Sequence, residues 1–411
     1  MPLQTISQAD FLEHLQQVPE ASFTQSSQMA TLLEKRGCRV DYLGYIVEGQ
    51  IKVSALLYSL PMTGGFHMEI NCGPIYTDSR YLSDFYQELQ TYAKSKGALE
   101  LIIKPYDTYQ DFDSNGTPSS PERPELIRTL TDLGYKHDGL QTGYPGGEPD
   151  WLYVKDLTGL TEANLLNSFS KKRQYLVKKA NTFGIQLKRL ERDQLDIFKS
   201  ITATTSDRRE YTDKPLDYYQ DFYDSFGTNA DFMIATLNFK AYLEELDKGQ
   251  KKVKQILAEL QEKLELRPNA SQLHRQIKEY QRQFDSFEIR KKEAQELLTQ
   301  YGDQDVVLAG SLFIYSQHET VYLFSGSYPE FNKFYAPVLL QEYVMKEALK
   351  RGISFYNFLG IMGIFDGSDG VLRFKQNFNG RIVRKMGTFR YYPNPFKVKM
   401  IRGLKKILHR S

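Results

Sequence analysis

Two consecutive runs of heptad-spaced apolar residues constrain the fold of this 411-residue chain more than any other feature. The runs Leu243–Leu264 and Leu273–Leu298 both step alternately by three and four residues, and an Arg-Pro-Asn segment separates them. Each run has one strongly polar position on this stripe, Gln250 in the first and Lys291 in the second. Such spacing predicts two helices that pair through their apolar stripes. We therefore expect residues 240–303 to form an antiparallel coiled-coil arm with a solvated outer face.

The two halves of the chain resemble each other outside this arm. In each half a strand pattern leads into a helix, then a glycine, then a second strand pattern, and the glycines are Gly97 and Gly352. Glycine directly after a helix is typical of a left-handed cap. Two interpretations remain open: a chance likeness of strand–helix–strand units, or a duplicated domain with a ligand cleft between the copies.

The length and these patterns predict an α+β fold with more than one domain. A chain of this length corresponds to two or three domains at roughly 100–200 residues each. We expect a first mixed-sheet domain at residues 1–148 and a second at residues 149–239 and 304–395. The arm interrupts the second domain, because strand patterns lie on both sides of it. Residues 396–411 form a separate C-terminal segment.

That C-terminal segment lies within a strongly basic end of the chain. Residues 381–411 contain ten Lys or Arg and no Asp or Glu, although the whole chain has a formal net charge of only +2. From Phe396 onward, apolar residues recur at helical spacing and basic residues fill the other positions. A basic amphipathic helix of this kind is typical of a membrane-surface element. Docking on the protein body or contact with a nucleic acid are the alternatives.

Common catalytic and cofactor motifs are absent. The sequence has no GxSxG elbow, no Walker loop, no GxGxxG after a strand, and no glycine-rich phosphate loop of the acetyl-coenzyme A enzymes. Its two cysteines and six histidines show no metal-ligand spacing. We therefore expect neither a metal nor a cofactor.

A basic segment at residues 168–189 contains no acidic side chain. It carries the cluster Lys171, Lys172, Arg173, Lys178 and Lys179. One interpretation is an ordinary solvated face, and the other is a surface that binds nucleic-acid phosphates by displacing counterions.

Two further segments combine residue types that suit anionic ligands. Residues 204–223 place two arginines beside several tyrosines, a set that can clamp an anionic or sugar-bearing substrate. A helix start with surface aromatics is the alternative. Residues 365–380 contain several glycines, which imply tight turns just before Phe374 and Lys375.

Together, these segments resemble the Fem family of peptidoglycan aminoacyltransferases, in particular its streptococcal MurM and MurN branch. In chain order the shared features are FTQS at Phe23, CGPIYTD at Cys72, a basic helix ending in KKANTFG, the arm, YLFSGS before YAPVLLQ, and FLGIMG followed by DGVLRFKQNFNG. The resemblance covers nearly the whole chain. One departure is Met29, near a position where the family often has a tryptophan.

The resemblance implies two acetyltransferase-like (GNAT-type) domains with an inserted arm. It also implies the transfer of a small amino acid, alanine or serine with alanine favoured, from aminoacyl-tRNA to an amine of the stem peptide of lipid II. Such an enzyme would be cytoplasmic and peripheral at the inner face of the plasma membrane. The absent nucleotide motifs fit this chemistry, because an aminoacyl ester is already activated and needs no ATP.

The resemblance also assigns roles to individual residues. Lys375, Phe374, Asp111 and Tyr109 match positions near the reacting groups. Lys35, Arg208, Tyr211 and Tyr322 match positions that bind the sugar-peptide diphosphate substrate. With a tRNA donor, the phosphate-binding interpretation of the basic segment predicts that Lys171, Lys172, Arg173, Lys178 and Lys179 contact the tRNA.

Two other functions remain open from the sequence. A coenzyme A-dependent small-molecule N-acyltransferase is disfavoured by the missing phosphate loop. A non-enzymatic scaffold suits the arm and the basic tail, but it does not explain the clustered Arg, Tyr and Lys residues of the mixed domains.

Overall fold

The computed structural model describes residues 2–209 and 212–407, and its core is built on two eight-stranded mixed sheets. In the first sheet the strands run β1 (Leu3–Thr5), β2 (Arg39–Val47), β3 (Gln50–Met62), β4 (Gly65–Asn71), β6 (Ala98–Lys104), β16 (Phe389–Tyr391) and β8 (Lys136–His137), and β5 (Ile75–Tyr76) pairs with β3. In the second sheet they run β10 (Gln186–Arg189), β11 (Ala230–Asn238), β12 (Asp305–Tyr315), β13 (Thr320–Ser327), β14 (Phe355–Gly360), β9 (Trp151–Asp156), β15 (Arg381–Lys385) and β7 (Thr108–Phe112). With the helices around them, these sheets confirm the predicted α+β class.

Each sheet contains the strand–helix–strand unit that the two halves of the sequence predict. Helix α3 (Leu82–Ser95) connects the parallel strands β4 and β6, and α10 (Ala336–Lys350) connects the parallel strands β13 and β14. Gly97 and Gly352 follow these helices with φ of 76° and 73°, the left-handed conformation expected there.

The two sheets exchange strands. Strand β7 comes from the first part of the chain but pairs with β15 at the edge of the second sheet. Strand β16 comes from the last part and pairs with β6 and β8 in the first sheet. This exchange ties the two sheets together through backbone hydrogen bonds and crosses the boundary expected near residue 148. The division of the chain into domains stays a prediction.

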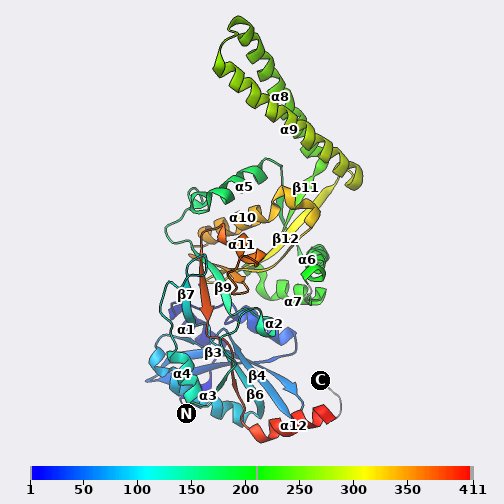
Figure 1. Ribbon diagram of the computed structural model, residues 1–411. Coiled ribbons are helices and arrows are strands. Elements are labelled where there is room, and N and C mark those ends of the chain that lie inside the picture. Colours follow the sequence, from blue (N-terminus) through cyan, green and yellow to red (C-terminus); the bar gives the residue numbers. More distant parts are fainter. Residues whose placement is uncertain (1, 210–211, 408–411) are drawn as a thin grey trace.

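The predicted arm is present and projects from the second sheet (Figure 1). It consists of α8 (Phe239–Leu266) and α9 (Ser271–Tyr301), which are roughly 42 Å and 47 Å long at 1.5 Å per residue. The two polar positions of the heptad runs face each other, because Lys291 Nζ donates a hydrogen bond of 3.0 Å to Gln250 Oε1. Gly249 gives Phe287 room, since a Cβ at Gly249 would lie 2.6 Å from that ring.

The base of the arm is part of the second sheet's core. Tyr242 and Phe239 are buried against Phe334, and Arg290 Nε donates a hydrogen bond of 2.9 Å to the Tyr242 hydroxyl. Beyond this base, the arm residues Val253, Leu257 and Leu260 are buried between the two helices alone.

The remaining helices cover the sheets. They are α1 (Gln8–Gln17), α2 (Ser27–Lys35), α4 (Glu125–Asp132), α5 (Lys171–Asn181), α6 (Leu195–Arg209), α7 (Leu216–Phe226), α11 (Gly370–Gln376) and α12 (Pro395–Ile407). Helix α12 lies beside the first sheet, at the end of the molecule opposite to the arm (Figure 1). No helix in the described ranges is long and apolar enough to cross a membrane.

Candidate functional site

A cavity of about 210 Å³ lies between the two sheets. The first-sheet side contributes the FTQS segment, α2, β3 and β4, and the second-sheet side contributes α7 and Leu323 of β13. Gln25 of the FTQS segment is 1% exposed and bridges two strands: its Nε2 donates to Asn71 O at 2.8 Å, and its Oε1 accepts from Leu56 N at 2.8 Å. The FTQS segment therefore fixes one wall of this cavity.

Ion pairs join the two helices that flank the cavity. Arg36, directly after α2, lies 2.6 Å from Asp217 and 3.1 Å from Asp221 of α7. Lys35 Nζ lies 3.6 Å from Asp224 Oδ2 on the same helix. An anionic substrate that bound Lys35 here would compete with Asp224 for its ammonium group.

The other residues expected on the substrate side fall in different places. Arg208 lies in the last turn of α6, but its side chain and the whole of Tyr211 are outside the described part of the chain. Tyr322 stacks on Phe313 with ring centroids 5.8 Å apart. Its strand neighbour Leu323, not Tyr322, lines the cavity, because successive side chains in a strand face opposite sides of the sheet.

Lys375 is 3% exposed, which is unusual for a lysine. It lies in the last turn of α11, a short helix that the Asp369 carboxylate caps by accepting hydrogen bonds from Val371 N and Leu372 N. Lys375 Nζ donates to Leu359 O at 3.1 Å and to Gly360 O at 2.6 Å, at the end of β14. The structure thus buries the amino group of a lysine at the end of that strand.

Strands β13 and β14 separate beside this lysine. Their parallel pairing includes only Thr320 with Tyr356 and Val321 with Asn357. The corresponding pair in the first sheet, β4 and β6, stays paired from Phe66 to Asn71. Residues 322–327 of β13 are half-buried. The parallel strands of the second sheet are therefore paired over a much shorter stretch than those of the first sheet.

A buried carboxylate connects the two sheets to this end of β14. Glu319 is 1% exposed and accepts hydrogen bonds from Phe23 N at 3.0 Å, Tyr106 Oη at 2.7 Å and Asn357 Nδ2 at 2.9 Å. Burial raises its pKa above the usual range for a glutamate. Asn357 Oδ1 in turn accepts a hydrogen bond of 2.8 Å from Leu359 N.

Leu359 is the residue whose carbonyl binds Lys375. Its φ of 59° lies in the left-handed region, which is unfavourable for leucine. The Glu319–Asn357 pair holds this turn from one side and Lys375 holds it from the other. Nothing in the local sequence around Glu319 indicates this role, because the residue lies in a short turn between β12 and β13.

The prediction that Arg173 contacts tRNA does not fit the position of its side chain in the structure. Its side chain points inward and is 3% exposed, so it does not present its charge to a phosphate backbone. One terminal nitrogen donates a hydrogen bond of 2.8 Å to Phe374 O. The guanidinium lies 4.6 Å and 4.4 Å from the ring centroids of Phe374 and Phe378. Arg173 therefore attaches α5 to α11, the helix that carries Lys375.

The other four members of that cluster lie on the outside of α5. Lys171, Lys172 and Lys178 are exposed, and Lys179 is half-buried with its ammonium 5.3 Å from the Tyr335 ring centroid.

Tyr109 and Asp111 both lie on the exchanged strand β7. The Asp111 carboxylate is bound by two arginines, Arg123 at 2.7 Å and Arg381 at 3.5 Å. Tyr109 is 5% exposed, and burial, followed by a hydrogen bond to Glu122, raises the pKa of its hydroxyl. The two arginines therefore hold the Asp111 carboxylate at this edge of the second sheet.

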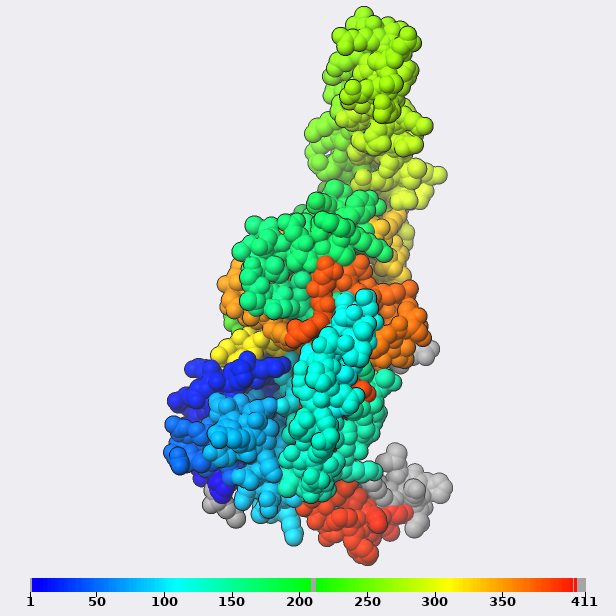
Figure 2. All heavy atoms as spheres, turned by 60° about the vertical axis from the view of Figure 1, so that its left-hand side comes forward, coloured from blue at the N-terminus to red at the C-terminus, as the bar shows by residue number. Residues whose placement is uncertain are grey.

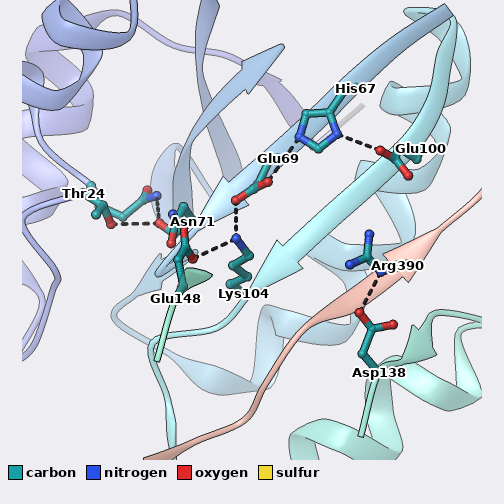
Figure 3. A network of polar contacts seen from close by, with 10 residues as sticks. Thr24, His67, Glu69, Asn71, Glu100, Lys104, Asp138, Glu148 and Arg390 are labelled. Atoms are coloured by element: carbon teal, nitrogen blue, oxygen red, sulfur yellow. Dashed lines mark hydrogen bonds and ion pairs between the residues drawn. The ribbon is translucent and has the colours of Figure 1, made fainter. Parts of the chain in front are cut away.

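A network of charged side chains crosses β4 and β6 beside the cavity wall (Figure 3). His67 binds Glu100 at 2.9 Å and Glu69 at 3.2 Å, and Lys104 binds Glu69 at 2.9 Å. The two glutamates raise the pKa of His67 to about 9, so this imidazole is protonated at neutral pH. His67, Glu69 and Asn71 alternate along β4, a spacing that could have revealed one polar strand face.

Taken together, the paired sheets, the exchanged strands and the buried lysine define a two-part enzyme core with an inserted arm. A family model described as the FemAB family matches residues 6–406, and the chain belongs to that family. The prediction of an aminoacyltransferase is confirmed at the level of this family. Its narrower assignment to the MurM and MurN branch stays a prediction.

The chain is also similar to named relatives, and it shares its fold with a solved structure. The chain is 26% identical to "Aminoacyltransferase FemA" of Staphylococcus epidermidis over 368 residues, 88% of each chain. It is also 26% identical to the Staphylococcus aureus protein of the same name over 398 residues, 95% of this chain and 94% of that one. A crystal structure of FemX matches with a TM-score of 0.75 at 19% identity, covering both chains completely.

Proposed function

We propose that this protein transfers a small amino acid, alanine or serine with alanine favoured, from aminoacyl-tRNA to an amine of a peptidoglycan precursor stem peptide. Family membership and the names of the curated relatives support the acyl-transfer class. The single observation that carries the proposed site is the buried Lys375 side chain at the end of β14, beyond the point where β13 and β14 stop pairing.

The reaction needs no covalent catalyst, because the aminoacyl ester is already activated. It does need a positive charge near the reacting carbonyl oxygen. The acceptor nitrogen attacks the ester carbonyl, the carbon–oxygen bond to the ribose breaks, and the amine proton ends on the ribose oxygen. Negative charge develops on the carbonyl oxygen before that bond breaks, and a buried cation stabilises such charge more strongly than an exposed one does. In our proposal Lys375 supplies this charge. The hydrogen bond from Arg173 to Phe374 O holds the backbone next to Lys375 in place.

The acceptor must also lose one proton before it attacks, in addition to the proton that later ends on the ribose oxygen. A free lysine side chain has a pKa near ~10.4 and is mostly protonated at neutral pH. In our proposal Asp111 and Tyr109 lie on the acceptor side. Asp111 takes up the proton that converts the ammonium group to the neutral amine, and the second proton of that amine goes to the ribose oxygen as the ester bond breaks. The diphosphate part of the precursor binds near Lys35, Arg208 and Tyr211, and Tyr322 contacts the substrate from β13.

Helix α12 is proposed as the contact with the inner face of the membrane, where a lipid-linked acceptor resides. Val398 is 6% exposed, and Ile401 packs against Gly64 of the β3–β4 turn, so one side of the helix is docked. Phe396, Met400 and Leu404 are 79%, 52% and 51% exposed along another stripe. Lys397 and Lys399 lie on the same helix. Residues 408–411 of the predicted segment lie outside the described residues.

The experiment that tests the proposal offers two donors to one acceptor. Purified protein is incubated with a lysine-containing precursor and either alanyl-tRNA or acetyl-coenzyme A. We expect amide formation only from the charged tRNA, and strong loss of that activity in the Lys375→Met variant. Acylation from coenzyme A instead would identify a small-molecule N-acyltransferase. Release of amino acid without amide formation would show that the acceptor is wrong.

A further inference from the structure

The outer face of α5 has a composition that its position in the fold does not explain. At 3.6 residues per turn, the side of this helix opposite to Arg173, Val177 and Ala180 is centred on Tyr175. Those three inward residues are 3% exposed or less, whereas Tyr175 is 61% exposed. An exposed aromatic ring therefore lies on the middle of the solvent side.

Four lysines surround this ring. Lys171 and Lys172 precede Tyr175 by four and three residues, and Lys178 and Lys179 follow it by three and four. Residues at these spacings are neighbours on a helix surface. The outer face of α5 is thus a tyrosine ring framed by four ammonium groups.

Of these four lysines, Lys179 lies beside the Tyr335 ring, and none has an acidic partner among the described residues. Helix α5 contains no acidic residue, and within the described ranges none of the four lysines forms an ion pair. Two of them, Lys171 and Lys172, occupy the first turn of the helix, where the helix dipole disfavours cations. The arm differs, because it mixes acidic and basic residues and forms pairs such as Lys248 with Glu245. Lys178 and Lys179 lie in the last turn, where the dipole favours cations. No acidic partner among the described residues neutralises the four lysines, so they suit an external anion.

We propose that this face binds the unpaired acceptor end of tRNA, with one base stacked on Tyr175 and the four lysines on the flanking phosphates. A base stacked on an aromatic ring among cations is a common arrangement for single-stranded nucleic acid. A membrane surface fits α5 less well, because its outer face has no exposed aliphatic residue and it lies far from α12 (Figure 1). The inference rests on the proposed tRNA donor and identifies where that donor is held.

The position of α5 relative to Lys375 supports this assignment. On its inner side the helix is joined to the α11 segment by Arg173 to Phe374 O and by Ser170 N to Asn377 O at 3.0 Å. The outer face therefore lies about one helix diameter, roughly 10–12 Å, from the helix that carries Lys375. In Figure 2 the green surface around α5 is open to solvent and borders the orange-red segment near α11. If one base stacks on Tyr175, the few nucleotides beyond it can extend to the candidate site.

The test separates RNA binding from transfer. Affinity for uncharged tRNA is measured by fluorescence anisotropy at several salt concentrations, and transfer is measured with alanyl-tRNA and with a short aminoacyl ester of adenosine. We expect Tyr175→Ala to weaken tRNA binding and raise the KM for alanyl-tRNA about tenfold, with kcat little changed. Tyr175→Trp should retain wild-type values, and the short donor should be used equally by all three proteins.

Charge is tested in parallel by replacing the four lysines of α5 with Gln. This variant should bind tRNA with a clearly smaller salt dependence, because each lost phosphate contact lowers the slope by about one or less. The matched control replaces four exposed arm lysines, Lys251, Lys252, Lys254 and Lys263, and should leave the slope nearly unchanged.

Two outcomes would overturn the inference: unchanged tRNA affinity in Tyr175→Ala together with an unchanged slope in the lysine variant, or loss of anionic-vesicle binding instead of tRNA binding. Tyr175-dependent tRNA binding by a protein that transfers nothing would leave the inference standing and refute the proposed function.

Discussion

Replacing Arg173 by Met tests whether this residue supports the candidate site or contacts RNA directly. Burial lowers the pKa of Arg173 to about 10, which corresponds to a cost of roughly 3 kcal/mol for keeping its charge in place. A charged hydrogen bond contributes roughly 2 kcal/mol. Contact with two aromatic rings in a desolvated site adds roughly 1–2 kcal/mol for each ring. The favourable interactions therefore exceed the cost by about 1–3 kcal/mol.

Methionine fills much of the same space but leaves Phe374 O without its donor. We expect the free energy of unfolding, measured with urea, to fall by about 1–3 kcal/mol. We also expect kcat for transfer to fall about tenfold or more, because α11 and Lys375 lose an anchor. The salt dependence of tRNA binding should stay at its wild-type value.

The neighbouring lysine provides the control for this experiment. Lys172→Met removes an exposed charge from the same helix, so it should leave the free energy of unfolding unchanged and reduce the salt dependence of tRNA binding. If Arg173→Met instead behaved like Lys172→Met, with unchanged stability and a smaller salt slope, then Arg173 would contact phosphate and its structural role would be refuted.

Three further predictions concern the lysine, the polar network and the arm. Lys375→Met should lower kcat/KM by at least about 100-fold and remain folded, and near-normal kinetics would remove Lys375 from the active site. His67 has its pKa raised to about 9, so its contribution of up to about 3 kcal/mol is complete below pH 6.5 and is lost as the pH rises through 9. The free energy of unfolding of the wild type should therefore fall more steeply over this range than that of His67→Gln, and parallel curves would refute the ion pairing. Replacing residues 254–283 by a short Gly-Ser turn should preserve cooperative unfolding, whereas removing Leu243–Leu298 should destabilise the protein because it exposes the aromatic base of the arm. If the two truncated proteins were equally stable, the base of the arm would not contribute to the core as proposed.

Local and periodic features of the structure could be predicted from the sequence. The arm follows from heptad spacing alone, and even its two polar positions, Gln250 and Lys291, proved to be partners. The strand–helix–glycine–strand units were visible for the same reason, since each depends on neighbouring residues. The sequence also indicates that Arg173 is buried, because Val177 and Ala180 lie on the same side of the helix. Counting charges alone does not show this.

Contacts between distant segments could not be predicted in this way. The exchange of β7 and β16 between the sheets depends on pairing across more than 240 residues, for which no local pattern exists. Glu319 lies in a short polar turn, and its burial arises only when Phe23, Tyr106 and Asn357 converge on it from other parts of the chain. The resemblance of motifs identified Lys375, but only the fold reveals the two carbonyl groups that hold its ammonium.

The central claim is that a charged tRNA is the donor and a peptidoglycan precursor amine is the acceptor. Mass spectrometry of a lipid-linked precursor, after incubation with the protein and separately charged alanyl-, seryl- and glycyl-tRNA, tests it most directly. We predict a mass increase of one alanine residue, or one serine residue, on the stem-peptide amine, and no increase with uncharged tRNA or with Lys375→Met. An unmodified precursor with every charged tRNA, from protein that is folded and binds both substrates, would contradict the account.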